Sequence, residues 1–589
     1  MSCQISASLS LLPLSAGDIS SPSSASRSAE GTTGVTNDKR TDAPLKAAQL
    51  SKRGQAHAVK ITPFWCIFDR MLQDAYCPRT NPSGVVNLGI ANNSLMEAEL
   101  LQFAKGHTAL EPTDLTYGTS LFGSTRLFNA FCHHFNTYFS PFESVQPHHI
   151  ITAPGCGSLL DQISTHLLDE GDSFLCAAPM YNGFPADAEP RSGVRVVPVY
   201  SPHGSGEGVE DEWYHGEGAL AGFQDALAAE TDTSSGTCKV KAIMLCQPHN
   251  PIGRCYDRDA MVAYGRFCQK NNLHLVSDEI YALSTFPTSD NGRPQPFVSA
   301  LSIDWEAEGV HPSRISVIYS ASKDTGLNGI RVGALVTQHN PELMAAMKVT
   351  AKLNMVGSPS DALYSALLLD RYFFPRFVAT NRARLTASYE TIKSWLLHHK
   401  LSYSPSNAGH FVMVDFTPLL PKIDKDGKAV EDLRDADTLL WAKALEHKVA
   451  ITPGSNYNYP RPGVFRVTFS LLPTALNEGL RRLELVLGLD DNPWTPPKTE
   501  LPTLGLQGTA AASTVPTGMA TAAGGESGAA SAQLGTPSSV EEAILGSRRP
   551  RKRRHTEGTS DFDLCTARLP ELNMEQLTAL RNAGSSCCC

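Results

Sequence analysis

The sequence predicts an α/β fold in which helices cover both faces of a mostly parallel β-sheet. Short strand-like apolar runs alternate with longer helical patterns along the chain. The runs lie at 150–152, 173–176, 240–245, 273–277 and 315–319, and apolar helical patterns follow two of them at 159–168 and 260–271. Strands that alternate with helices favour a parallel sheet, because each connection must cross one of its faces.

Composition and charge restrict the class of protein. The chain has 589 residues, 41% of them hydrophobic and 19% charged, and its net charge is −9. This is the composition of a globular protein with a sizeable core, and the negative charge argues against bulk binding of nucleic acid or membrane surfaces. The fourteen cysteines have no paired C-x-x-C spacing, which indicates neither a zinc site nor a disulfide framework and favours a reducing compartment.

Low-complexity segments flank the predicted folded body, which runs from about 60 to 492. Residues 1–55 are rich in Ser, Ala, Thr and Gly, which predicts a disordered segment. The tail, 493–589, contains the basic run 548–554, a short helical pattern at 572–580 and a terminal cysteine triplet. The basic run fits a nuclear import signal as well as a solvated charge cluster. We find no signal peptide and no membrane-spanning run, so we expect a soluble, cytoplasmic protein.

The predicted strands end in residues suited to an aromatic, phosphorylated ligand, and parallel sheets bind ligands at this edge. After the first run, a turn leads into a helix and exposes backbone N–H groups to an anion, although an ordinary turn has the same composition. That turn is formed by Gly155, Cys156, Gly157 and Ser158. After the second run, Tyr181 can stack on a ring or fill a core.

The third and fourth strand ends carry polar side chains. Asn250 lies between two prolines that fix a loop, which either aims its amide inward or forms a plain turn. Asp278 can keep a ring nitrogen protonated, and Tyr281 can donate to a phenolate oxygen. A helix N-cap followed by a core tyrosine is the alternative.

The group after the fifth predicted strand is the most distinctive. Lys323 follows a buried strand directly, and lysine seldom lies near a core unless it is paired or functional. Ser320, Ser322 and Arg331 supply hydroxyls and a planar cation suited to phosphate. Together with the other strand ends, these neighbours favour a functional lysine over a solvated one.

These motifs resemble the class I aminotransferases of pyridoxal 5′-phosphate (PLP) fold type I, and within them the branch related to 1-aminocyclopropane-1-carboxylate (ACC) synthase. The resemblance is carried by 87–91, Tyr117, 250–253, 277–281, 320–324 and 463–467, in the order of the family. It implies a large domain with a mostly parallel seven-stranded sheet and a smaller α+β domain. We expect the small domain at 56–110 and 361–492, and the large PLP-binding domain at 111–360.

The resemblance also implies roles for individual residues toward the cofactor. Lys323 is the expected catalytic residue and forms the Schiff base, or internal aldimine, with PLP, while Asp278 pairs with the pyridine nitrogen. Asn250 and Tyr281 hydrogen-bond the ring oxygen, and Tyr181 stacks on the ring. The expected phosphate ligands are Gly155, Cys156, Gly157, Ser158, Ser320, Ser322 and Arg331. No metal is expected.

Toward substrate and partner, the resemblance implies four further residues. Arg466 binds the substrate α-carboxylate, and Ala91 and Asn92 lie at the substrate site. Tyr117 reaches the phosphate of a neighbouring subunit's cofactor, which implies a homodimer with shared active sites. Asn92 stands where ACC synthases carry a glutamate, so either cyclopropane-forming chemistry is disfavoured or the change is a neutral loop variation.

The sequence therefore predicts a PLP-dependent enzyme that acts on an amino acid, with transamination as the first choice. The alternative is an ACC synthase-like or carbon–sulfur lyase that acts at Cβ or Cγ, because the same carbanion can expel a leaving group. An alternative of another class is a non-catalytic regulatory protein on the same scaffold. The presence of Lys323, Asp278 and Arg331 argues against it.

Overall fold

The computed structural model describes part of the chain in detail. The described residues are 48–58, 63–107, 110–202, 213–231, 239–290, 295–424, 426–498 and 500–504. The chain divides into two units, and the second, Gly505–Asp563, lies outside the described residues. The predicted basic run, helical pattern and cysteine triplet of the tail also lie outside them, as does most of the segment predicted to be disordered.

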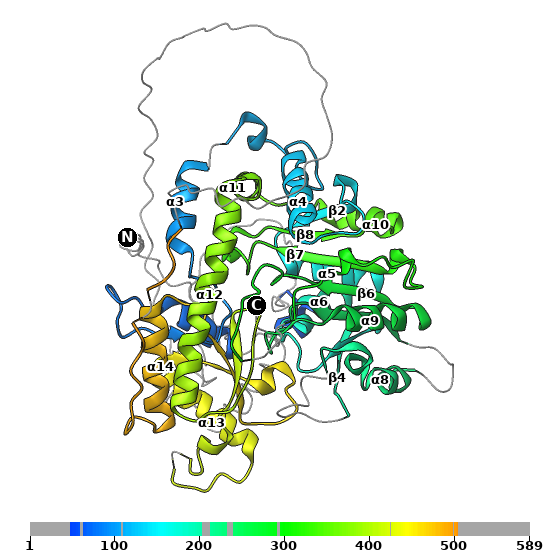
Figure 1. Cartoon of the computed structure of the whole chain (residues 1–589). Helices are drawn as coiled ribbons and strands as arrows, with labels where there is room; N and C mark the ends of the chain where they lie inside the picture. The colour runs from blue at the N-terminus through cyan, green and yellow to red at the C-terminus, as the bar shows by residue number, and fades with distance from the viewer. Residues whose placement is uncertain are drawn as a thin grey trace, which may run out of the picture. The chain divides into compact units, whose positions relative to one another are not determined.

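A seven-stranded sheet forms the larger part of the fold (Figure 1). Its strands are all parallel except β8, which is antiparallel to both of its neighbours. In spatial order they are β2 (Ile150–Ala153), β8 (Gly333–Val336), β7 (Ile315–Ser320), β6 (His274–Asp278), β5 (Val240–Cys246), β3 (Ser173–Ala177) and β4 (Arg195–Val199). The α/β fold with a mostly parallel sheet is confirmed, and all five predicted strands are present within one residue at each end.

Helices cover both faces of this sheet. Along β5, Ile243 and Leu245 belong to one hydrophobic cluster, whereas Met244 between them belongs to another. This alternation is the period of a strand that is buried on both sides. The first cluster includes side chains of α4 (Thr125–Tyr138), α8 (Phe223–Ala229), α9 (Arg258–Lys270) and α11 (Ser358–Leu369), and the second those of α5 (Cys156–Leu167), α6 (Phe184–Ser192) and α10 (Pro341–Ala351).

The remaining elements bring the two ends of the folded body together. Strand β1 (Val86–Asn87) pairs in parallel with β11 (Val449–Ala450). The C-terminal part of the folded body also forms a four-stranded antiparallel sheet. That sheet consists of β12 (Thr452–Pro453), β13 (Val464–Thr468), β10 (Phe411–Asp415) and β9 (Tyr403–Ser404). The helices are α1 (Lys52–Ala58), α2 (Pro63–Gln73), α3 (Glu97–His107), α12 (Phe373–His398), α13 (Leu433–Glu446) and α14 (Pro473–Leu487), and Figure 1 shows α12 running beside α14.

Residues from both ends share one hydrophobic cluster. It includes Val86 and Leu88 from the N-terminal part, and Trp395, Phe465 and Leu483 from the C-terminal part, all fully buried. The expected pairing of 56–110 with 361–492 in one small domain stays a prediction. The exact boundaries of the domains, including the end of the first segment near α1, stay predictions.

Arg482 fastens the N-terminal part to α14. Its guanidinium is buried and donates to the carbonyl oxygens of Gly84 (2.6 Å), Lys448 (2.7 Å) and Pro82 (2.8 Å). Its Nε also donates to Glu478 (2.7 Å). Four hydrogen bonds from one buried cation make this arginine a structural crosslink between segments almost 400 residues apart in sequence.

We expect Arg482→Ala to lower the free energy of unfolding by about 3 kcal/mol, because it removes the donor to the buried Gly84 carbonyl oxygen together with three further hydrogen bonds. The matched control is Arg481→Ala, since Arg481 pairs with the same Glu478 but is largely exposed. That control should cost less than about 0.5 kcal/mol. Urea denaturation of both variants measures the difference, and equal losses would contradict the crosslinking role.

Two further features bear on the sequence-based expectations. Cys77 is disulfide-bonded, which the spacing of the cysteines did not predict, whereas Cys156 and Cys246 are free thiols. Within the part of the chain described, no helix combines the length and the apolar character that crossing a membrane requires. The cytoplasmic location stays a prediction.

Candidate active site

A cavity of about 550 Å³ opens where the parallel strands end. Cys246 and Asp278, the last residues of β5 and β6, line it, and so does Lys323, three residues after β7. Its volume lies within the range of small-molecule and cofactor sites. The cavity brings together most of the residues predicted from the sequence, namely Asn92, Cys156, Gly157, Ser158, Tyr181, Asn250, Asp278, Tyr281, Ser322, Lys323 and Arg331.

Lys323 and Asp278 face the same cavity. The Lys323 amine donates to the carbonyl oxygen of Ala91 at 3.1 Å. Burial raises the pKa of Asp278 to about 7, the hydrogen bond from the Ile280 amide opposes this rise, and the positive charge of Lys323 opposes it further. An amine and a buried carboxyl are thus both within reach of a single ligand.

The middle of the cavity carries groups that suit a phenolic ring. The Tyr281 hydroxyl is buried and has no hydrogen-bond partner within the described part of the chain. Because a buried hydroxyl without a partner costs free energy, a ligand oxygen at this place would be favoured. The Asn250 amide oxygen accepts from Arg466 at 2.8 Å, which leaves its amide nitrogen to donate to a ligand.

The anion-binding end lies at the N-terminus of α5. The first N–H groups of a helix have no partner within the helix and carry partial positive charge, and Cys156, Gly157 and Ser158 form this turn. Gly155 precedes it with φ of +86°, and a Cβ there would lie 2.4 Å from a guanidinium nitrogen of Arg331. Only glycine therefore lets the arginine approach the turn.

Arg331 brings a positive charge to this end of the cavity. Its guanidinium donates to the carbonyl oxygens of Asn328 (2.9 Å) and Pro154 (2.8 Å). In the described part of the chain, no carboxylate lies within ion-pairing distance of it. Arg331 is exposed, and its guanidinium is held only by neutral carbonyl oxygens, so it is available to pair with an anionic ligand. The helix N-terminus, Arg331, the free Tyr281 hydroxyl and Asp278 together fit PLP, which has a phosphate, a phenolic oxygen and a ring nitrogen.

Several predicted site residues lie behind or away from the cavity wall. Ser320 is fully buried, and its hydroxyl accepts from the Ser322 amide at 3.2 Å. Gly155 contacts Arg331, and Ala91 contributes its carbonyl oxygen to Lys323. Tyr117 is 78% exposed and does not line the cavity.

Arg466 lies behind Asn250 in β13. Its guanidinium is 4% exposed and donates to Asn250 and to the Gly89 carbonyl oxygen, at 2.8 and 2.5 Å. The rings of Phe411 and Tyr457 lie 4.7 and 4.6 Å from it. Its Nε has no acceptor, and no carboxylate pairs with it within the described residues. A buried guanidinium with only neutral partners suits an incoming carboxylate.

The structure adds cavity residues that sequence reasoning missed. Phe68 and Leu72 lie one turn apart on α2 and form an apolar wall with Ile90. Asp187, in the first turn of α6, adds a second acid. The amphipathic pattern of α2 was a usable signal for an apolar wall. No local signal separates Asp187 from an ordinary acid near a helix N-terminus.

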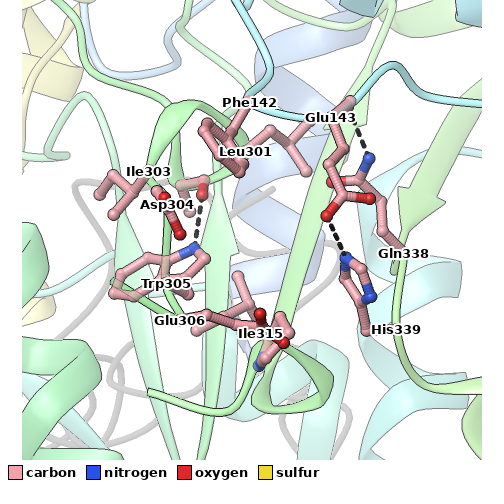
Figure 2. Close-up of a pocket in the computed structure, with 12 residues that line it drawn as sticks. Phe142, Glu143, Leu301, Ile303, Asp304, Trp305, Glu306, Ile315, Gln338 and His339 are labelled. Carbon is pink, nitrogen blue, oxygen red and sulfur yellow. Dashed lines mark hydrogen bonds and ion pairs between the residues drawn. The ribbon is translucent and has the colours of Figure 1, made fainter. Parts of the chain in front are cut away.

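A second, much smaller cavity lies at the opposite edge of the sheet (Figure 2). Ile315, the first residue of β7, lines it, whereas Lys323 lies beyond the other end of that strand. Figure 2 shows His339 pointing toward Glu143, and their nearest nitrogen and oxygen atoms are 3.4 Å apart. The Trp305 indole donates to the Ala300 carbonyl oxygen at 2.8 Å. Its volume of about 50 Å³ is too small for a cofactor, and it contains none of the predicted site residues.

Comparison with known families gives one match over most of the folded body. The profile described as "Aminotransferase class I and II" matches residues 83–483. The match begins just before β1 and ends within α14, so it covers both the large sheet and the C-terminal elements.

Individual relatives agree with this match. The chain is 32% identical over 413 residues to the probable aminotransferase gliI of Aspergillus fumigatus, which covers 70% of this chain and 91% of the relative. It is 30% identical over 428 residues to 1-aminocyclopropane-1-carboxylate synthase 1 of Oryza sativa subsp. indica, with 70% and 82% covered. Among solved structures, it is similar to a mutant aspartate aminotransferase of Thermus thermophilus, with a TM-score of 0.55, 20% identity and coverage of 75% and 100%.

Proposed function

The chain belongs to the aminotransferase class I and II family, and we propose that it transfers the amino group of an amino acid to a keto acid. Enzymes of this family depend on PLP. The observation that carries the proposal is the single cavity lined by Lys323, Asp278 and Arg331. An amine, a ring-nitrogen partner and a phosphate partner at one site are what PLP chemistry requires.

Bound PLP supplies an electron-accepting ring that stabilises negative charge at the substrate Cα. In our proposal, Asp278 holds the proton on the ring nitrogen. Burial raises the pKa of Asp278 to about 7, and a cationic ring nitrogen next to the carboxyl favours its ionised form. Asn250 and Tyr281 donate to the phenolic oxygen, and Tyr181 packs against the ring face.

Lys323 is proposed both to hold the cofactor covalently and to act on the substrate proton. Once the substrate amine has replaced it, its Nζ would act as the general base that removes the proton from Cα and returns a proton to the cofactor's aldehyde carbon. The Ala91 carbonyl oxygen, 3.1 Å from Nζ, keeps the amine in place during this transfer.

Arg466 is proposed to bind the α-carboxylate of the substrate. Its hydrogen bond to Asn250 links this anchor to the residue that contacts the ring oxygen, so the carboxylate and the ring are held in one frame. Two N–H groups of one guanidinium can bind the two oxygens of one carboxylate. This bidentate contact would also fix which Cα bond lies perpendicular to the plane of the cofactor ring.

We propose a homodimer whose interface includes the segment around Tyr117. Leu110, Leu115, Tyr117 and Leu121 are 44%, 80%, 78% and 40% exposed. Four large apolar side chains on one short surface segment favour burial against another subunit. Tyr117 then approaches the phosphate of the partner's cofactor.

A carbon–sulfur lyase or an ACC synthase-like enzyme is the second candidate, and the 30% identity to the rice ACC synthase favours it. Asn92 weighs against cyclopropane formation. Its side chain is neutral, lines the cavity and accepts from Asn328 at 2.7 Å. It therefore offers no carboxylate at the place where ACC synthases carry one.

A panel of amino acids with keto-acid acceptors tests the proposal on the PLP-loaded protein. We expect a keto acid and a new amino acid in equal amounts, identified by mass spectrometry. Release of a thiol, ammonia or a cyclopropane product without an acceptor would favour the lyase. Protein that takes up no PLP would overturn both.

A further inference from the structure

Asp187 is a carboxyl group in the cavity that none of the roles above uses. It lies in the first turn of α6, and its Oδ1 is 3.0 Å from where a Cβ on Gly157 would stand. Gly157 belongs to the N-terminal turn of α5, so the carboxyl lies beside the N–H groups of the anion-binding end. Within the described part of the chain, its side chain has no hydrogen bond and no ion pair.

Burial favours the neutral form of Asp187. Burial raises its pKa to about 7, the attraction of Arg331 opposes this rise, and the repulsion from Asp161 adds to it. Asp161, on α5, is itself paired with Arg191 of α6 at 2.9 Å. Further charged or titratable groups on elements packed against α6 are His166 on α5 and Arg195 on β4, which pairs with Glu230, and Asp278 and Lys323 line the same cavity.

We propose that Asp187 binds the cofactor's phosphate as the neutral acid and donates its proton to a phosphate oxygen. An ionised carboxylate at this place would repel a phosphate dianion across a desolvated gap, whereas a carboxylic acid forms a short charge-assisted hydrogen bond with it. The proposal rests on the proposed function, because it needs the phosphate of PLP at the N-terminus of α5.

The proposal makes phosphate binding depend on pH with a definite sign. The protonated form binds, so affinity is full below the pKa of Asp187 and falls as the pH rises through about 7. Binding takes up one proton above this pKa, and the affinity then falls by roughly tenfold per pH unit. The phosphate is already a dianion above pH 7, since its second pKa is about 6, and therefore adds little slope of its own.

The test uses 4′-deoxypyridoxine 5′-phosphate, which has no aldehyde and so does not react with Lys323. Its dissociation constant is measured by tryptophan fluorescence on PLP-free protein at pH 7, 8 and 9. For the wild type we expect the dissociation constant to rise roughly tenfold for each pH unit. For Asp187→Asn, which keeps a donor but cannot ionise, we expect a smaller slope and tighter binding than the wild type at pH 9. Equal slopes would overturn the proposal.

Calorimetry in two buffers of different ionisation enthalpy provides a second readout. At pH 8 the wild type should take up about one proton more per bound phosphate ligand than Asp187→Asn. Asp187→Ala has neither charge nor donor, so its affinity should depend less on pH than that of the wild type and should be weaker than that of Asp187→Asn. It replaces the asparagine variant in the test if that variant does not fold. Asp161→Asn is the matched control, and it should keep the wild-type slope.

The outcomes separate this proposal from the proposed function. Wild-type protein that binds the probe with the same affinity at all three pH values would refute only the role of Asp187. Wild-type protein that does not bind the probe at any pH would refute the PLP site itself.

Discussion

Lys323→Ala is expected to abolish covalent attachment of PLP and to lower kcat by on the order of 10²–10⁴-fold through loss of the general base. The wild-type protein should be yellow and should gain a borohydride-stable mass of one cofactor per chain. The variant should bind PLP only reversibly through the anion-binding end and the ring contacts, which the substitution leaves in place. Absorption spectra and intact mass after reduction measure both properties.

Lys352→Ala is the control for this experiment. Lys352 is exposed at the end of α10 and does not line the cavity, so its removal should leave colour, mass and rate unchanged. A Lys323→Ala protein that kept the reduced adduct would place the covalent attachment on another amine and refute the assignment.

Arg466→Ala is expected to raise the KM for the amino acid substrate by roughly 10- to 150-fold, the equivalent of one charge-assisted hydrogen bond of about 1.5–3 kcal/mol. The rise follows because the buried guanidinium is the proposed partner of the α-carboxylate. The rate at saturation should fall less than the KM rises. Steady-state kinetics over a wide range of substrate concentration measure the two effects.

Two variants make this result specific. Arg466→Lys keeps a positive charge but loses the planar fork, and it should give an intermediate KM. Arg461→Ala removes a nearby arginine that pairs with Asp415 at 2.8 Å, and it should have little effect. An unchanged KM in Arg466→Ala would show that the carboxylate binds elsewhere.

The central strands of the large sheet could be predicted from sequence because they are buried on both faces and read as continuous apolar runs. β4 was missed because it is an edge strand, where burial is lower and Pro198 interrupts the run. β8 was missed because its four residues directly follow the loop at Arg331, and a short run after a functional loop carries no pattern of its own.

The cofactor end of the site was predictable for a related reason. Its residues follow the strands directly, so locating the strands also located Asp278, Lys323 and the turn before α5. The rest of the cavity comes from segments whose position depends on tertiary packing. Phe68 lies 255 residues before Lys323, and the amphipathic pattern of α2 predicts an apolar face but does not say that this face covers the cavity.

The segment 89–91, just after β1, accepts hydrogen bonds from both Arg466 and Lys323. The Gly89 carbonyl oxygen accepts from Arg466, and the Ala91 carbonyl oxygen accepts from Lys323. The preceding strand, β1, pairs with β11, which lies more than 350 residues later in the sequence. The strands of the large sheet can therefore form during synthesis before Arg466 and Lys323 are aligned with each other. We expect an active site only after β11 has been synthesised and has paired with β1.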